Sequence, residues 1–172
     1  MRCEFTIDED DPEEVRAELA YHLNGTAMRN RQILASDPRF PRLFKSGVRY
    51  GLDADIATVQ RFLNCRQVLA QRVACCKSLC AWRIAELRND ARDENEASRV
   101  DFDITWEDSR TDPYRVGLVP KNGFVRLWHV NVRRADGSIE NPSRKLRAQQ
   151  RPGIVGTAAS RWPLLGKLRA LR

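Results

Sequence analysis

Apolar residues recur at helical spacing along the first part of the chain. Val15, Leu19 and Leu23 are four residues apart, so they fall on one face of a helix. This spacing predicts an amphipathic helix over residues 11–35, and Gly25 is the point at which it could be interrupted.

The next part of the chain combines loop signals with further helical spacing. Residues 36–50 contain two prolines and a glycine, which predicts a connecting loop held down by its apolar side chains. A second helix is predicted over residues 53–69, and a third, the most regular, over residues 76–90. The expected inner positions are Ile56, Val59, Phe62, Leu63 and Leu69 in the second helix, and Leu79, Arg83 or Ile84, and Leu87 in the third.

From Ala97 onward the spacing of apolar residues changes to two. Val100, Phe102 and Ile104 alternate with polar residues, which predicts a half-buried strand. Residues 108–117 are polar and predict a loop.

Two further strands are predicted at 124–132 and 138–141, joined by a tight turn at Asp136-Gly137. Helices followed by an antiparallel meander indicate an α+β fold rather than an alternating parallel one. The predicted organisation is a helical extension (1–35), a core (36–147) and a basic C-terminal arm (148–172).

Length and composition fit one soluble domain. The 172 residues are 42% hydrophobic and 31% charged, and no apolar run approaches the roughly 20 residues that span a bilayer. We therefore expect no membrane partner. The N-terminus turns acidic at once, so no secretory signal is predicted and synthesis in a cytoplasm is expected.

Positive charge is concentrated at the C-terminal end. Residues 142–172 hold eight Lys or Arg and no Asp or Glu, whereas residues 1–141 hold 22 basic and 23 acidic side chains, a net charge of −1. The net charge of +7 therefore belongs to the tail. On this count, the globular part is not expected to bind nucleic acid.

Five cysteines (Cys3, Cys65, Cys75, Cys76 and Cys80) form an odd set without a secretory context, so no disulfide framework is predicted. Cys76 and Cys80 are four apart, but no second cysteine pair exists and the chain has only two histidines. We expect no metal and no cofactor. His22, within the first helix, is predicted to be a packed or exposed histidine.

Three residues suit thiol chemistry. Cys76 is predicted at the start of the third helix, where a helix N-terminus favours a thiolate. His129 is predicted on a strand that can hold an imidazole against that helix end, and Asn141 on the paired strand, within reach of the ring. Together they are a candidate nucleophile, base and orienting residue. Gln67, Gln71 and the Cys76 backbone N–H are open alternatives for an oxyanion donor.

The amino-acid sequences of three segments resemble those of a known family. Residues 74–88 (ACCKSLCAWRIAELR) resemble the cysteine helix of transglutaminase-like, papain-like proteins, which begins Gly-Asp-Cys. Residues 128–132 (WHVNV) resemble the family's histidine strand, and residues 139–143 (IENPS) its Asp-Pro-Ser strand. The resemblance implies that fold, with Cys76, His129 and Asn141 in the catalytic positions.

A closer resemblance is to small transglutaminase-like proteins encoded among tailed-bacteriophage structural genes. It covers roughly residues 40–147 and includes a Ser-Gly-Val-Arg-Tyr segment at 46–50. Three departures stand out: Ala74-Cys75 replaces Gly-Asp, Lys77-Ser78 replaces two acids, and Asn141 replaces the orienting Asp.

Two functions follow from the resemblance. The first is a structural protein of the virion, near the head–tail junction or in the tail, with an altered thiol site. The second is an active thiol peptidase, amidase or acyl transferase that works through a Cys76 acyl-enzyme. For the arm 148–172 we expect contact with other virion proteins, within an oligomeric particle. Non-specific DNA contact and a solvated tail are the alternatives.

Overall fold

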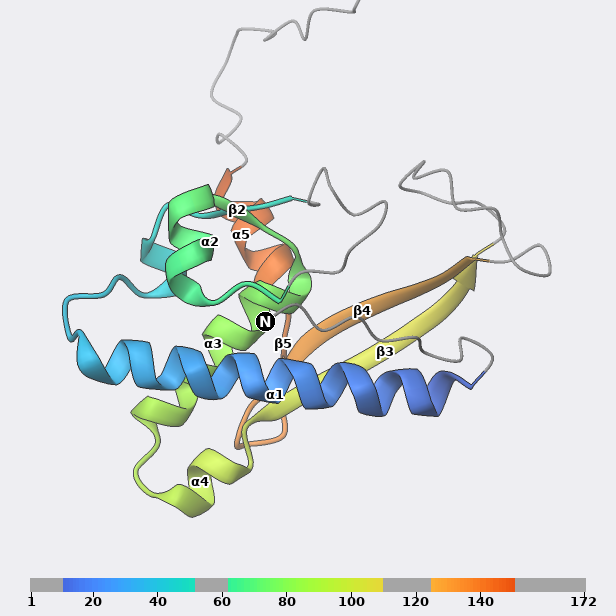
Figure 1. The fold of residues 1–172 in the computed structure, drawn as a ribbon, viewed down its shortest axis with the longest axis horizontal. Helices are drawn as coiled ribbons and strands as arrows, with labels where there is room; N and C mark the ends of the chain where they lie inside the picture. The colour runs from blue at the N-terminus through green and yellow to red at the C-terminus, as the bar shows by residue number, and fades with distance from the viewer. Residues whose placement is uncertain (1–10, 52–61, 110–124, 151–172) are drawn as a thin grey trace, which may run out of the picture.

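Helices come first in this fold and the larger sheet follows, as Figure 1 shows. The computed structural model describes residues 11–51, 62–109 and 125–150. The elements within these ranges are α1 (Pro12–Ser36), η1 (Leu43–Lys45), β1 (Arg49–Tyr50), α2 (Cys65–Gln71), β2 (Val73–Ala74), α3 (Cys76–Asp90), α4 (Glu94–Ser98), β3 (Asp101–Ser109), β4 (Val125–Arg133), β5 (Ile139–Glu140) and α5 (Pro142–Gln150).

The first helix, α1, confirms the predicted one. Asp11 caps it, since its carboxylate accepts the backbone N–H groups of Glu13 (2.8 Å) and Glu14 (3.3 Å). The helix runs through Gly25 without a break. Its buried face, which includes Leu19 and Leu23, packs along α3.

The second helix is shorter than predicted. In the described residues α2 begins at Cys65, so the expectation that Phe62 and Leu63 are helical is wrong. The physical reason is Asn64, whose side chain accepts two backbone N–H groups of the first turn, while Gln67 reaches back to the Asn64 N–H. Ile56 and Val59 lie outside the described residues.

The antiparallel meander is present as β3-β4-β5. Phe102 pairs with Val132 and Ile104 with Val130, and this shared face is turned toward α1 and α3. Gly137 has a φ of +84° in the turn between β4 and β5, as the Asp-Gly signal predicted. Most of the predicted loop 108–117 lies outside the described residues.

Helix α4 and the strands β1 and β2 were not predicted. Helix α4 occupies the position where the strand was expected to begin at Ala97, because Asp93 caps it by accepting the Glu96 N–H. The two-residue strands β1 and β2 form a parallel pair in which Tyr50 lies opposite Ala74. Such short strands leave no periodic signal in the sequence.

The end of the described chain also differs from the prediction. Residues 142–150 form α5, whereas the sequence predicted a strand through Asn141 and an extended arm beyond it. Pro142 takes the first helical position and Asn141 caps the helix. α5 therefore crosses the predicted start of the arm at 148, and residues 151–172 lie outside the described part.

Helix α3 is the centre of the molecule. One apolar cluster joins it to α1 and the face of β3 and β4, and a second joins it to α2, β1, β2 and α5. The second cluster includes Leu43, Val68, Trp82 and Leu146. The prediction of a single inner stripe on α3 was too narrow, since both sides of the helix are buried. The architecture is α+β.

No helix within the described ranges has both the length and the apolar character needed to cross a membrane.

Candidate functional site

Cys76 is the first residue of α3. Cys75 precedes it in an extended conformation. The Cys75 side chain accepts no hydrogen bond from the backbone N–H groups of the first helical turn, so it does not cap the helix. The Cys76 side chain is partly buried against the first apolar cluster.

Two neighbouring cysteines differ from Cys76 in their surroundings. Cys75 and Cys80 are buried, and burial raises the pKa of both thiols, of Cys80 most strongly. Cys80 Sγ donates to the carbonyl oxygen of Val130 over 3.1 Å. These two thiols are therefore neutral at physiological pH, and the Cys80 contact ties α3 to β4.

The contacts of α3 show that it runs in the same direction as β4. Cys80 contacts Val130, and three residues later Arg83 bonds Glu140, which pairs with Val132. Four helical residues rise about 6 Å, which matches about two residues of a strand. Cys76 therefore lies level with the strand residues just before Val130, the part of β4 that carries His129.

His129 and Asn141 are in direct contact. The amide nitrogen of Asn141 lies 2.9 Å from His129 Nε2. The register explains this contact: Val132 pairs with Glu140, so the next residue, Asn141, comes opposite Asn131. Side chains of alternate strand residues share a face, which places Asn141 diagonally beside His129.

A second bond fixes the orientation of the Asn141 amide. Its oxygen accepts the backbone N–H of Arg144 over 2.9 Å, as the cap of α5. A backbone N–H can only donate, so the oxygen must face Arg144 and the NH₂ group must face the ring. His129 Nε2 is then an acceptor, and the proton of the neutral ring is on Nδ1.

The three predicted residues are not all joined. His129 and Asn141 are hydrogen-bonded to each other, but neither forms a hydrogen bond with Cys76 within the described residues. Strand alternation gives the reason. His129 alternates with Trp128 and Val130, and it is these two that share an apolar cluster with Cys76. The catalytic assignment stays a prediction.

Two of the three candidate oxyanion donors, Gln67 and Gln71, are side chains in the part of the chain that the structure describes. The Gln67 side chain is used in the cap of α2, and Gln71 is exposed. A cavity of about 600 Å³ lies between α1 and the start of α2, and its described lining does not include Cys76, His129 or Asn141. In the same parts of the chain, no cluster of three His, Cys, Asp or Glu residues could hold a metal ion.

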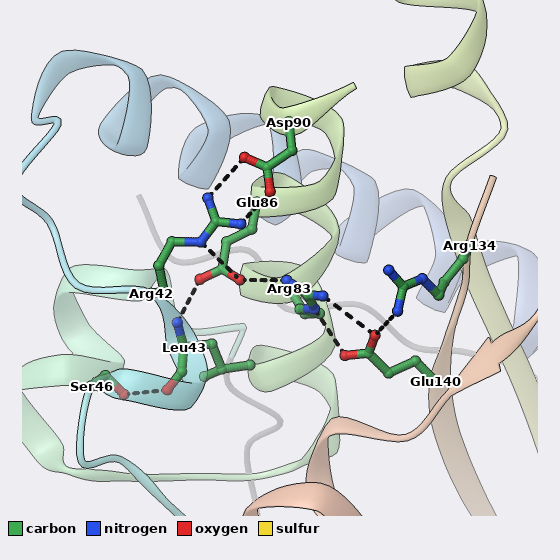
Figure 2. Close-up of polar contacts among 8 residues, drawn as sticks. All are labelled: Arg42, Leu43, Ser46, Arg83, Glu86, Asp90, Arg134 and Glu140. Carbon is green, nitrogen blue, oxygen red and sulfur yellow. Dashed lines mark hydrogen bonds and ion pairs between the residues drawn. The ribbon is translucent and has the colours of Figure 1, made fainter. Parts of the chain in front are cut away.

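An ion-pair network around Glu86 was missed by sequence reasoning (Figure 2). The Glu86 side chain is 1% exposed, and its two oxygens accept the Leu43 backbone N–H (2.5 Å) and Arg83 Nη1 (2.9 Å). Arg42 lies 3.7 Å away and also pairs with Asp90. A buried carboxylate with these partners is satisfied.

The network continues to the sheet. Arg83 donates to Glu140 over 2.8 Å, and Arg134 donates to the same carboxylate over 3.0 Å. Glu86 and Arg83 therefore tie the loop before η1 to α3, and α3 to β5. The signal in the sequence was Arg83 and Glu86, a charged pair three residues apart among the apolar residues Trp82, Ile84, Ala85 and Leu87.

The chain matches no protein-family model, no curated protein and no solved structure.

Proposed function

We propose that this chain is a structural protein of a bacteriophage virion, placed in the head–tail or tail region, with a transglutaminase-like core whose thiol site no longer performs acyl transfer. The core part of this proposal is supported by the arrangement of α3 and the sheet. A helix that begins with Cys76 packs along the strand of His129, and the following strand leads to Asn141. The virion part rests on the sequence resemblance.

The orientation of the Asn141 amide carries the proposal of an inactive site. A base that takes a thiol proton becomes an imidazolium and needs a partner that accepts its other N–H. Asn141 instead presents its NH₂ group to Nε2, because its oxygen is held by Arg144. A protonated ring would place two donors against each other there. The lack of a Cys76–His129 hydrogen bond supports the same conclusion.

An active thiol peptidase, amidase or acyl transferase is the second candidate. The observation in its favour is the position of Cys76, a partly accessible thiol at the N-terminus of a 15-residue helix. An accessible thiol is needed for such chemistry, because its thiolate is the attacking species.

Thiol reactivity separates the two candidates. The native full-length protein is treated with iodoacetamide near pH 6 and the label is mapped by mass spectrometry. An inactive site predicts that Cys76 reacts no faster than a free thiol. Labelling of Cys76 many times faster than glutathione, abolished in His129→Ala, would establish the enzyme instead.

The virion assignment needs its own test. Purified particles of the parent phage should contain the protein, and particles with Cys76→Ala should assemble and infect as the wild type does. If the protein is absent from purified particles, the structural assignment fails. If Cys76→Ala particles do not infect although they contain the protein, the thiol has a function and the inactive site is rejected.

A further inference from the structure

The fold separates positive from negative charge, although the sequence average does not. We define the basic lobe as residues 38–51, 62–74 and 141–150, which hold nine Lys or Arg and no Asp or Glu. The other described residues, 11–37, 75–109 and 125–140, hold 11 basic and 16 acidic side chains, a net charge of −5. The described residues, whose net charge is +4, therefore divide into a lobe of +9 and an acidic remainder of −5.

The three segments of the basic lobe form one structural unit. Leu43 and Val48 from the first segment, Val68 and Ala74 from the second and Leu146 from the third belong to the same buried cluster. β1 pairs with β2, and α5 packs on β1. In Figure 1 these elements gather on one side of α1.

Eight cations of the basic lobe are exposed and have no carboxylate partner within the described residues. Among ion pairs between described residues, Arg42 is the one member of the nine that takes part, with Glu86 and Asp90. The eight are Arg39, Lys45, Arg49, Arg66, Arg72, Arg144, Lys145 and Arg147. Cations gathered on one structural unit without acidic partners repel one another, so an anionic partner would relieve the repulsion.

The side-chain types in the basic lobe indicate which kind of anionic partner it binds. Six of the eight are arginines, whose planar guanidinium groups bind phosphate oxygens through two N–H groups at once. The ring faces of Phe44 and Tyr50 are covered by Lys145 and Arg147, each 4.2 Å from the ring centre, so these rings are occupied rather than open for base stacking. This favours contact with a backbone over contact with unpaired bases.

A membrane surface fits less well. The large apolar side chains that are exposed in the described ranges are Tyr21, Met28 and Ile139, and all three lie outside the basic lobe. A surface helix that enters a bilayer needs an apolar face turned outward. In α5 the buried Leu146 is instead turned into the second apolar cluster.

We infer that the basic lobe binds the phosphate backbone of double-stranded DNA without sequence preference. Residues 151–172 follow directly from α5 and carry five further basic residues and no acid, so they extend the same positive charge. This inference does not depend on the thiol site or on the virion assignment.

The test compares two full-length variants that each lose three positive charges. The lobe variant is Arg49→Gln/Arg66→Gln/Arg144→Gln. The control variant is Arg16→Gln/Arg29→Gln/Arg99→Gln, with all three positions exposed and outside the lobe. Binding to a short duplex DNA is measured by fluorescence anisotropy between about 50 and 200 mM salt. Circular dichroism and thermal unfolding confirm that both variants are folded.

We expect the control to bind as the wild type does, apart from a small uniform loss. The lobe variant should bind about tenfold or more weakly, and its salt slope should fall by about 3, one for each lost phosphate contact. Equal affinities and slopes for the two variants would assign binding to residues 151–172 and overturn the inference. So would binding of polyglutamate or of anionic lipid vesicles as tight as the binding of the duplex.

Discussion

Asn141 donates to Nε2 of His129 over 2.9 Å, and the oxygen of the same amide accepts the Arg144 N–H at the start of α5. The helix cap thus decides which end of the amide meets the imidazole. A residue in this position both caps α5 and contacts the His129 ring. An asparagine that caps the helix with its oxygen can present only its NH₂ group, a donor, to the ring. An aspartate could accept from both sides.

Asn141→Asp should make Cys76 more reactive. A carboxylate would accept the Arg144 N–H and also an N–H on His129 Nε2, so an imidazolium at position 129 becomes more favourable. We expect labelling of Cys76 by iodoacetamide near pH 6 to increase about tenfold. Asn141→Ala is the control: it removes the cap, costs about 1 kcal/mol of stability and should not raise the labelling rate. Unchanged labelling of Asn141→Asp would mean that His129 does not act on Cys76.

Glu86→Ala should destabilise the protein strongly. The change leaves the Leu43 N–H without its acceptor and Arg83 without one of its two carboxylates, both in buried surroundings. Removal of one partner from such a buried pair costs about 3–5 kcal/mol. Urea unfolding gives the free energy. Glu94→Ala, which breaks an exposed pair with Arg31, serves as the control and should leave the midpoint unchanged. Similar midpoints for the two variants would contradict a structural role for Glu86.

The stability of the protein should fall as the pH rises above about 9. Burial raises the pKa of the Cys65 thiol from its usual value of 9.0 to about 11, so in this range the unfolded chain releases a proton that the folded chain retains. Stability then decreases with pH, by at most about 1.4 kcal/mol per pH unit from this group.

Cys65→Ala isolates this contribution from other groups that titrate in the same range. Urea midpoints of the reduced protein at pH 8 and pH 10 should fall less in the variant than in the wild type, by roughly 1 kcal/mol in free energy. An identical pH dependence in both proteins would show that Cys65 titrates normally in the folded state.

Gly51 should not tolerate a side chain. A Cβ at this position would come within 2.6 Å of Val73 Cγ1, beside the parallel pair of β1 and β2. We expect Gly51→Ala to cost about 1–3 kcal/mol, and the double variant Gly51→Ala/Val73→Ala to recover part of that loss. Gly25→Ala is the matched control, because nothing lies within 4 Å of its Cβ. In mid-helix it should stabilise by about 0.5–1 kcal/mol. Additive costs in the double variant would exclude the clash.

The sequence by itself determined the elements whose signals are local. The four-residue spacing of Val15, Leu19 and Leu23 predicted α1, alternation around Phe102 predicted β3, and Asp-Gly predicted the turn at Gly137. Each of these depends on neighbours within a few residues, so periodicity and turn chemistry are sufficient. The α+β class followed from their order.

Only the tertiary structure decided the features that join distant segments. The buried position of Glu86 depends on Leu43 and Arg42 from a loop more than 40 residues earlier. The direction of the Asn141 amide depends on whether α5 begins there, which the sequence had predicted as strand and arm. The charge averaged along the sequence concealed a lobe that packing assembles from three acid-free segments. In each case the feature depends on contacts between residues far apart in the sequence. The pattern of residues along the chain does not specify which distant segments come into contact.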